Sequence, residues 1–341
     1  MTLSRRENCP ELDLSTNKIF VTGGCGFIGS HLCELLVKTG HPVVAFDRYN
    51  PNNDWGWLEY AEGLDGIDVV LGDIRDYDSV IRAMTGCAAV FHLAALIGIP
   101  YSYISPLGYI RTNVEGTYNV LEAARELKVK EVIVTSTSET YGTAQYVPIN
   151  EQHPLIGQSP YSASKIAADQ LSLSYFHSFG LPIKIVRPFN TYGPRQSARA
   201  VIPTVISQAL AGAVEITLGN TSPRRDLTYV SDTCAGMLEV FRSHALYGEV
   251  TNIGMNAEIS IAELVDMIGS IMGRQLFIAE ENERKRPIGS EVERLRCDNT
   301  KILQKTSWRP KFELQDGLKR TIEWFSNTKN QAFYKHNVYN V

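Results

Sequence analysis

The chain has 341 residues, 44% of them hydrophobic and 21% charged, with a formal net charge of −4. This composition is typical of a globular protein, and the charge balance gives no indication of a general affinity for nucleic acid. No run approaches the roughly 18 apolar residues of a membrane span, and the polar residues 1–15 lack the apolar core of a signal peptide. We therefore expect a cytoplasmic protein of two lobes, preceded by an N-terminal extension at 1–15, that binds no membrane.

Six cysteines stand in the sequence: Cys9, Cys25, Cys33, Cys87, Cys234 and Cys297. None has the CxxC spacing or the neighbouring histidines of a zinc site. Reduced thiols are the simplest interpretation for a cytoplasmic protein. The prediction is therefore a chain with free cysteines and without a bound metal.

In the first half of the chain, continuous apolar runs alternate with helical patterns. The runs stand at 18–22, 42–46, 68–71, 88–93, 131–135 and 183–187, and helices are expected at 27–38, 77–84, 107–127 and 161–179. Strands that are apolar throughout and separated by helices indicate a parallel sheet covered on both faces. The predicted fold class is therefore α/β, with a doubly wound parallel sheet.

After Pro188 the pattern changes to shorter elements and frequent turns. Helices are expected near 202–211, 261–272 and 314–325, and a strand at 214–218. They indicate a smaller C-terminal α/β lobe, made of residues 189–226 and 256–330, that binds the substrate. The first lobe is predicted at 16–188, with 227–255 returning to it.

A glycine-rich turn follows the first strand and opens the first helix. Gly23, Gly26 and Gly29 have the spacing GxxGxxG. Such glycines permit a tight turn, a close approach of the backbone to a pyrophosphate and close packing of helix on strand. Phe27 and Ile28 begin a helix whose N–H groups can bind the phosphates. The set is typical of a Rossmann-type dinucleotide site, although glycines alone also occur in ordinary strand-to-helix turns.

The ends of the next strands indicate which dinucleotide binds. Asp47 can accept hydrogen bonds from both ribose hydroxyls and would repel a 2′-phosphate, which favours NAD over NADP, and the adjacent Arg48 partly offsets that preference. We expect five more residues at strand ends to contact the cofactor: Asp73 and Ile74 near the adenine, and Leu93, Ala94 and Ala95 along its path. His92 is expected to be a packed strand residue.

Tyr161 and Lys165 stand four residues apart at the start of a predicted helix, so their side chains lie on one face. A free tyrosine, with a pKa of about 10, is a poor base at pH 7. The neighbouring ammonium and a nicotinamide cation would lower that pKa, so that the phenolate can take a proton from a sugar hydroxyl. We predict that both residues are catalytic and also contact the cofactor.

The glycine turn and the Tyr161-x-x-x-Lys165 pair together resemble the extended short-chain dehydrogenase/reductases. The segments 187–194 (RPFNTYGP) and 225–232 (RDLTYVSD) are similar to the nucleotide-sugar branch of that family, and the resemblance spans about residues 17–327. It implies a nucleotide-sugar substrate, bound NAD and a homodimer formed through the helices at 107–127 and 161–179.

In the second lobe, the resemblance implies that Asn190, Arg225 and, as a weaker candidate, Arg286 bind the nucleotide diphosphate. A guanidinium group suits this task because its planar fork can bind two phosphate oxygens. A solvated basic face is the alternative interpretation of the run 284–286.

The turn Thr137-Ser138-Glu139 after the fifth strand resembles the nucleotide-sugar 4,6-dehydratases of this branch. Simple 4-epimerases usually carry small, non-acidic residues at the last two positions, whereas nucleotide-sugar decarboxylases share the Thr-Ser-Glu turn. The segments 195–203 and 290–301 are most similar to dehydratases of the legionaminic-acid pathway, which act on nucleotide-linked N-acetylglucosamine.

A 4,6-dehydratase oxidises C4 of the hexose, eliminates water across C5 and C6, and returns the hydride to C6. We expect Tyr161 to deprotonate the 4-hydroxyl, Thr137 to hydrogen-bond O4 and Glu139 to remove the C5 proton. Related enzymes often carry aspartate at the Ser138 position, and serine is a weak acid. The group that protonates the leaving hydroxyl therefore stays open between Glu139 and Ser138.

Three other functions compete with this interpretation. A decarboxylase of the UDP-glucuronate type would need a cationic or polar pocket for the C6 carboxylate. A C4-epimerase would not need Glu139, and a non-catalytic NAD(P)-sensing protein would have no reason to keep Tyr161, Lys165 and Glu139 together. The nucleotide stays open among UDP, GDP and dTDP.

Overall fold

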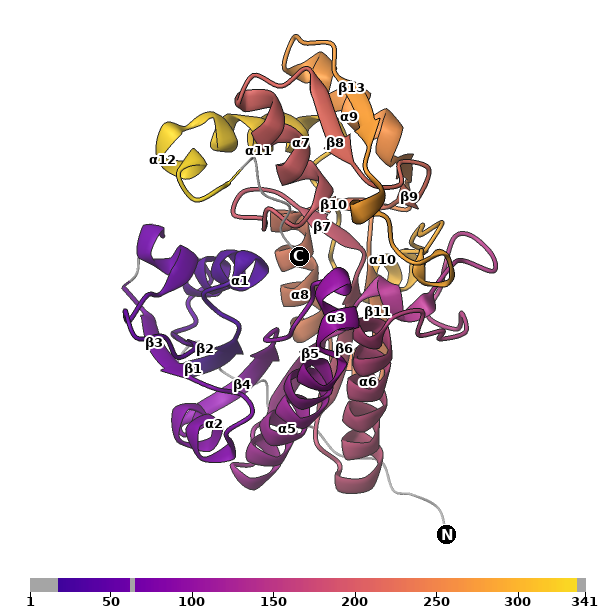
Figure 1. Cartoon of the computed structure of the whole chain (residues 1–341). Helices are drawn as coiled ribbons and strands as arrows, with labels where there is room; N and C mark the ends of the chain where they lie inside the picture. The colour runs from indigo at the N-terminus through magenta and orange to yellow at the C-terminus, as the bar shows by residue number, and fades with distance from the viewer. Residues whose placement is uncertain (1–17, 62–64, 336–341) are drawn as a thin grey trace.

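The computed structural model describes residues 18–61 and 65–335, and its largest element is a parallel sheet (Figure 1). Within the described residues, seven strands form this sheet in the order β11–β6–β5–β4–β1–β2–β3. The strands are β1 (Lys18–Thr22), β2 (Val43–Arg48), β3 (Ile67–Gly72), β4 (Cys87–His92), β5 (Glu131–Thr135), β6 (Ile183–Pro188) and β11 (Val250–Ile253). All neighbours pair in parallel, which confirms the predicted fold class.

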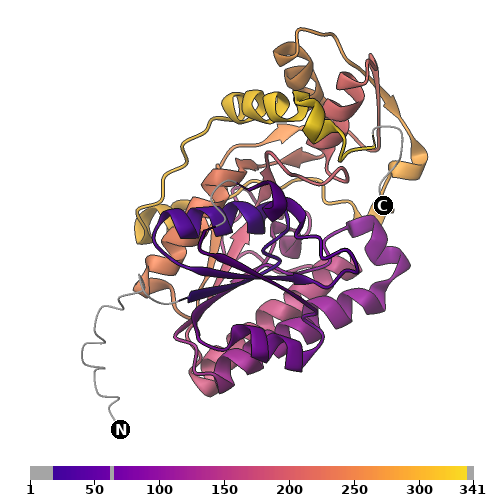
Figure 2. The same cartoon turned by 90° about the vertical axis from the view of Figure 1, so that its left-hand side faces the viewer.

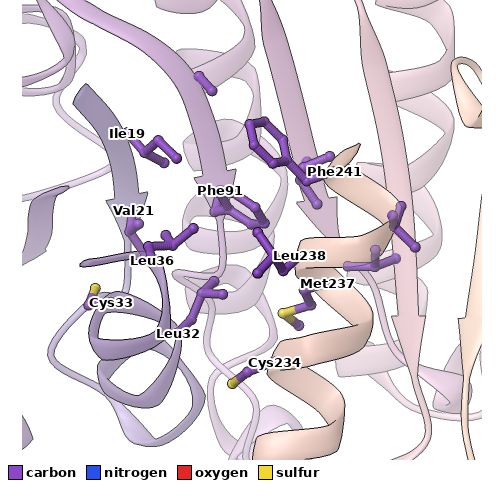
Figure 3. Close-up of a cluster of buried hydrophobic side chains, with 14 of the residues drawn as sticks. Ile19, Val21, Leu32, Cys33, Leu36, Phe91, Cys234, Met237, Leu238 and Phe241 are labelled. Carbon is purple, nitrogen blue, oxygen red and sulfur yellow. The ribbon is translucent and has the colours of Figure 1, made fainter. Parts of the chain in front are cut away.

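Helices cover both faces of the sheet, as Figure 2 shows from the side. On one face lie α1 (Phe27–Lys38) and α8 (Val230–Arg242), and on the other lie α2 (Tyr77–Met84), α5 (Gly116–Glu126) and α6 (Pro160–Phe179). Figure 3 shows the first of these interfaces, where Leu32 and Leu36 of α1 and Leu238 of α8 lie beside Val21 and Phe91 of the sheet. Burial on both faces explains why these strands are apolar throughout.

The helical run predicted at 107–127 is continuous but not uniform. It begins as α4 (Pro106–Tyr109), passes through the π-helix η3 (Ile110–Glu115) and ends as α5. The short helix α3 (Ile99–Ile104) precedes it. π-helical turns inside longer helices are frequent at functional sites, and η3 packs against α6.

A smaller group of elements lies above the sheet in Figure 1 and has its own hydrophobic core. Its helices are α7 (Val201–Leu210), α9 (Ile261–Ile271), α11 (Leu314–Ser326) and α12 (Thr328–Gln331), and α10 (Thr300–Lys305) lies against β11. Three two-stranded sheets belong to this part of the chain: β8 (Glu215–Leu218) with β13 (Phe277–Glu280), β9 (Arg224–Arg225) with β12 (Ile259–Ser260), and β7 (Asn190–Tyr192) with β10 (Leu227–Tyr229).

The segment predicted to return to the first lobe divides between the two parts. β11 pairs with β6 and α8 covers the sheet, but β10 pairs with β7 and not with the main sheet. In the folded chain β11 takes the edge position beside β6, and residues 227–229 pair with β7 instead. The expectation of a return starting at residue 227 is therefore corrected to one that starts with α8.

An aromatic cluster joins the loop after β2 to the end of the described chain. Trp57, in the short helix η2 (Gly56–Tyr60), lies with its ring centroid 5.6 Å from that of Trp324, 5.1 Å from Phe333 and 6.4 Å from Tyr334. Its backbone N–H donates to the carbonyl of Cys25 in the glycine turn at 3.0 Å. We call Trp57, Tyr60, Trp324, Phe333 and Tyr334 the aromatic clasp, because they tie the glycine turn to the C-terminal helices.

No helix within residues 18–61 and 65–335 is long and apolar enough to cross a membrane. The cysteines in these ranges, Cys25, Cys33, Cys87, Cys234 and Cys297, are buried and free. Cys9 and the predicted extension at 1–15 lie outside the described residues.

The aromatic clasp predicts a stability effect. Trp57→Ala removes several ring contacts worth about 0.5–1.5 kcal/mol each, so we expect the free energy of unfolding to fall by about 2 kcal/mol. Urea unfolding measures this change, followed by far-ultraviolet circular dichroism because its backbone signal does not rely on the tryptophan that is removed. The control is Tyr49→Ala, because Tyr49 is 69% exposed. Equal losses of stability in the two variants would contradict a structural role of the clasp.

Candidate active site

The glycine turn forms a cradle from which side chains are excluded. Gly23 has a φ of +70°, and a Cβ there would lie 2.9 Å from the backbone nitrogen of Ala94. A Cβ at Gly29 would lie 2.0 Å from the carbonyl oxygen of Gly23. Among the described residues no side chain caps the start of α1 at Gly26, so the N–H groups of the first turn are available to a ligand. This cradle fits a pyrophosphate bound at a helix N-terminus.

Asp47 brings a carboxylate to the same turn. Its Oδ2 accepts a hydrogen bond from the backbone N–H of Cys25 at 2.9 Å, and its Oδ1 accepts one from the N–H of Arg48 at 2.7 Å. Burial raises the pKa of this carboxyl, and the two backbone hydrogen bonds act in the opposite direction. The position beside the glycine turn, at the end of β2, suits the ribose contact that the sequence predicts.

Three of the predicted catalytic residues meet where β5 ends and α6 begins. Thr137 caps the short helix η4 (Ser138–Tyr141) by accepting the backbone N–H of Glu139 at 3.3 Å. Tyr161 is buried in the first turn of α6, which is fixed by a capping box between Ser159 and Ser162. Burial raises the pKa of the Tyr161 phenol, the Thr137 hydroxyl beside it lowers that pKa, and the nearby charge of Glu139 raises it further.

Ser138 and Lys165 flank this group. Ser138 is buried in η4, next to Glu139. Lys165 is buried one turn along α6 from Tyr161, and its Nζ donates to the carbonyl oxygen of Thr135 at 2.7 Å. Burial lowers the pKa of Lys165, while the nearby carboxylate of Asp169 raises it. The ammonium is thus held at the end of β5 by the backbone.

Two arginines approach the same place from the second part of the chain. Arg286 Nη1 lies 4.0 Å from Glu139 Oε2 and 3.6 Å from Glu291 Oε1. Arg225, on β9, is buried, and its Nη2 lies 3.5 Å from the same Glu291 oxygen. Burial lowers the pKa of Arg225, and the charge of Glu139 is the strongest influence that opposes this shift. We call Glu139, Arg225, Arg286 and Glu291 the charge cluster.

The third predicted substrate residue, Asn190, lies on β7. Its Oδ1 atom is buried and has no hydrogen-bond partner among the described residues. A buried polar atom without a partner costs free energy, so it is a candidate for contact with a ligand.

Residues 20–321 match the family described as GDP-mannose 4,6 dehydratase. The chain belongs to this family. That finding confirms the resemblance stated from the glycine turn, the Tyr161–Lys165 pair and the nucleotide-sugar segments.

Curated relatives of this family member catalyse different reactions. The chain is 35% identical over 324 residues to a UDP-N-acetyl-alpha-D-glucosaminuronate decarboxylase from Bacillus cytotoxicus, covering 92% of this chain and 99% of the relative. It is 33% identical over 318 residues to a dTDP-glucose 4,6-dehydratase from Streptomyces griseus, covering 91% and 94% of the two chains. A UDP-glucose 4-epimerase from Mycolicibacterium smegmatis is also among the similar proteins.

Among solved structures, the chain is similar to DesIV from Streptomyces venezuelae, a dTDP-glucose 4,6-dehydratase with NAD and TYD bound. The TM-score is 0.83 at 29% sequence identity, over 92% of this chain and 98% of that one. The protein is therefore a member of a nucleotide-sugar family whose relatives include dehydratases, decarboxylases and epimerases.

Several residues predicted to bind the cofactor make hydrogen bonds or packing contacts to other residues of the protein. Asp73 accepts hydrogen bonds from Arg75 Nε at 2.9 Å and 3.1 Å, and this pairing lowers the pKa of its carboxyl. The Ile74 side chain packs in the core against Gly116 of α5. Leu93 and Ala94 donate their backbone N–H groups to Thr22 Oγ1, both at 3.1 Å, and Ala95 follows them.

Sequence reasoning missed four residues that hold the site. Asn113, in the π-helix η3, donates to Ser164 of α6 at 2.9 Å and exchanges hydrogen bonds with the backbone of Leu96. Asp169 and Arg187 form a buried ion pair whose charges act on Lys165, and Glu291 bridges the two arginines of the charge cluster. The one local signal is Asn113, a polar residue inside a predicted helix. Arg187 and Glu291 lie in the segments 187–194 and 290–301 that carry the resemblance, but no local pattern indicates which residues they or Asp169 contact.

His92 is a buried strand residue, as expected. Its Nδ1 lies 2.8 Å from Thr22 Oγ1 and its Nε2 lies 3.0 Å from Thr117 Oγ1. Burial, with a smaller contribution from Lys165, lowers the pKa of His92 to about 3. The ring is therefore neutral in the folded protein.

This shift predicts how stability depends on pH. In the unfolded chain a histidine has a pKa of about 6.5, so below that value the unfolded state binds a proton that the folded state does not bind. The protein should lose about 1.4 kcal/mol for each pH unit below 6.5 through this residue alone. Urea unfolding between pH 7 and pH 4.5 should therefore show a shallower pH dependence in His92→Gln than in the wild type. The exposed His177, changed to Gln, is the control, and identical slopes for all three proteins would refute the prediction.

Proposed function

We propose that the protein is an NAD-dependent nucleotide-sugar 4,6-dehydratase, a lyase that converts an NDP-hexose into the NDP-4-keto-6-deoxy sugar. The observation that carries the proposal is the meeting of Tyr161, Thr137 and Glu139 at one buried place beside Lys165. The proposal is supported by the similarity of the chain to two dTDP-glucose 4,6-dehydratases. N-acetylglucosamine is our preferred hexose, from the likeness of 195–203 and 290–301 to enzymes of that specificity.

The cofactor site fits NAD. The cradle of Gly23, Gly26 and Gly29, with the N–H groups of the first turn of α1, would hold the pyrophosphate, and Asp47 would hold the adenosine ribose. Bound NAD would supply the hydride acceptor for oxidation at C4 and, once reduced, the hydride donor for C6. The structurally similar DesIV contains NAD.

The protein's own residues would move the protons. Tyr161 takes the proton of the 4-hydroxyl, and Thr137 donates a hydrogen bond to O4. Glu139 takes the proton from C5, which the 4-ketone makes acidic, and the carboxyl then gives that proton to the 6-hydroxyl, which leaves as water. When the hydride returns to C6, C5 takes a proton from water through Glu139, and Tyr161 releases to water the proton that it took from the 4-hydroxyl. A serine is too weak an acid to protonate the leaving oxygen. We therefore assign to Ser138 only the orientation of that oxygen.

The second part of the chain, residues 189–226 and 256–330, would hold the nucleotide diphosphate. Arg225 is buried and charged, and the unpartnered Oδ1 of Asn190 lies near the start of the same segment. Arg286 reaches Glu139 as well, so we assign it to the sugar end of the site.

A decarboxylase is the second candidate, and one observation favours it. Arg286 lies 4.0 Å from Glu139 and could bind a C6 carboxylate, and a relative of 35% identity is a decarboxylase of an N-acetylated uronate. The test is incubation of the purified protein, without added cofactor, with UDP-, GDP- and dTDP-linked hexoses and uronates. Mass spectrometry that detects loss of one water from a hexose supports the proposal, and loss of carbon dioxide from a uronate refutes it.

Glu139→Gln separates the two chemical steps. We expect the variant to keep bound NAD and to oxidise C4, but to lose water elimination by about 10²–10⁴-fold, because the amide cannot accept the C5 proton. Absorbance of the reduced nicotinamide reports the first step, and exchange of the C5 hydrogen with D₂O reports the second. Tyr161→Phe is the control in which both signals disappear. Full turnover by Glu139→Gln would defeat the assignment.

We also propose a homodimer through the long helices. α5 and α6 lie side by side, as Figure 1 shows, and apolar side chains on the neighbouring α3, α4 and η3 are exposed: Ile104 by 70%, Leu107 by 56% and Ile110 by 54%. Exposed apolar groups gathered in one region mark interaction surfaces.

Ile110→Lys should break this dimer, because it would bury an unpaired charge in each half of the interface. Light scattering after gel filtration is expected to give twice the chain mass for the wild type and the single chain mass for the variant. Ile288→Lys, at a residue that is 97% exposed, is the matched control. A wild type that elutes as a monomer would sink the proposal.

A further inference from the structure

Glu291 occupies a central position in the charge cluster. Its Oε1 atom lies 3.5 Å from Arg225 Nη2 and 3.6 Å from Arg286 Nη1, and its side chain is 11% exposed. On the other side, Arg286 Nη1 lies 4.0 Å from Glu139 Oε2. One guanidinium nitrogen therefore stands between the proposed base and a second carboxylate that the proposed reaction does not use.

The backbone of Glu291 is anchored to a segment far away in the sequence. Its carbonyl oxygen accepts hydrogen bonds from Gln158 Nε2 and from Thr143 Oγ1, both at 3.3 Å. The preceding residue, Ser290, is 2.6 Å from the hydroxyl of Tyr103 through its Oγ. These contacts fix the backbone of Glu291 beside the two arginines, so its carboxylate is a constant part of the charge cluster.

The charges of the cluster balance. Glu139 and Glu291 carry two negative charges, and Arg225 and Arg286 carry two positive ones. When Arg225 binds the diphosphate of a nucleotide sugar, Arg286 is left between two carboxylates. A third carboxylate beside Arg286 would meet like charges at close range, and such contacts discriminate strongly against a ligand.

A neutral hydroxymethyl group would meet no such repulsion. Arg286 Nη1 is buried and has no hydrogen-bond partner among the described residues, so it can donate to a hydroxyl oxygen. The same nitrogen would otherwise bind a carboxylate well, because a guanidinium group favours anions. The carboxylate of Glu291, 3.6 Å from this nitrogen, would repel a second carboxylate but not a neutral hydroxyl group.

We propose that Glu291 is a specificity-determining residue that makes the pocket select a neutral 6-hydroxymethyl sugar over a 6-carboxylate sugar. It does so by sharing the positive charge of Arg286 with Glu139. This inference rests on the proposed function, because it assumes that the sugar lies beside Glu139. It deepens that function by naming the residue that separates hexose from uronate substrates.

The test measures binding and not turnover. All proteins carry Tyr161→Phe, which blocks oxidation, and are titrated by calorimetry with three matched pairs of ligands. The pairs are UDP-N-acetylglucosamine with UDP-N-acetylglucosaminuronate, dTDP-glucose with dTDP-glucuronate, and GDP-mannose with GDP-mannuronate. The measured quantity is the ratio of the two dissociation constants in the pair whose hexose binds most tightly.

We expect the parent protein to bind the hexose more tightly than the uronate. Glu291→Gln should shift the ratio at least tenfold towards the uronate, which corresponds to about 1.4 kcal/mol. Glu293→Gln removes the same charge from an exposed residue two positions along and should change the ratio less than twofold. Adding Arg286→Gln to Glu291→Gln should abolish the gain, because the cation that attracts the uronate is then gone.

Three results would overturn the inference. Equal tightening of hexose and uronate by Glu291→Gln would mean that this residue acts only on the diphosphate. If Glu293→Gln shifted the ratio as much as Glu291→Gln, the effect would come from net charge and not from the position of Glu291. If the shift towards the uronate persisted after Arg286→Gln, Arg286 would not be its cause. Thermal denaturation of each variant checks that the fold is kept, and Glu291→Asp, which keeps the charge, should keep the parent ratio.

The inference and the proposed function can fail separately. If the wild type dehydrates a hexose but the ratio does not move, only the role of Glu291 is refuted. If the ratio moves as expected but no hexose loses water, the dehydratase reaction is refuted and Glu291 remains the selective residue. Binding of none of the three hexoses would refute both.

Discussion

The proposed reaction centre depends on one buried ion pair. The carboxylate of Asp169 on α6 accepts a hydrogen bond from Arg187 of β6 and another from Ser136 at the end of β5, both at 2.6 Å. It therefore fixes the helix that carries Tyr161 against the strand that leads into Thr137 and Glu139. Removing one partner of a buried pair leaves an uncompensated charge, at a cost of about 3–5 kcal/mol. The ion pair and the Ser136 hydrogen bond thus join the helix that carries Tyr161 to the strand that leads into the turn.

The second part of the chain adds two arginines, Arg225 and Arg286, to the proposed reaction centre at the end of β5. Arg225 comes before β11, the last strand of the sheet in sequence, and Arg286 comes after it. The charge of Glu139 nevertheless raises the pKa of Arg225, and Arg286 Nη1 lies 4.0 Å from Glu139 Oε2. The two positive charges of the arginines are matched within the protein by Glu139 and Glu291. A charge cluster that is balanced in this way does not attract every anion, because the charges of a ligand must replace or avoid those already present.

Local sequence patterns predicted the parts of this protein that local physics determines. The sheet, the glycine turn and the Tyr161–Lys165 spacing each follow from a few neighbouring residues, and the fold class could be predicted from them. The pairing of β10 could not, because it depends on which strand occupies the edge of β6. Glu291 was missed for the same reason: it is 152 residues from Glu139 in the sequence numbering, and only the folded chain brings their charges to one arginine.

Burial acts on Tyr161 and Lys165 in opposite directions. It raises the pKa of the phenol and lowers that of the ammonium, so it disfavours the charged form of both groups. The phenol is therefore neutral and by itself a poor base. On the proposed function, the positive charge of the oxidised cofactor would stabilise the phenolate in the same water-poor surroundings, where charges interact strongly. The burial that disfavours the phenolate would then also strengthen its attraction to the cofactor's positive charge, so proton removal would be coupled to the presence of a hydride acceptor.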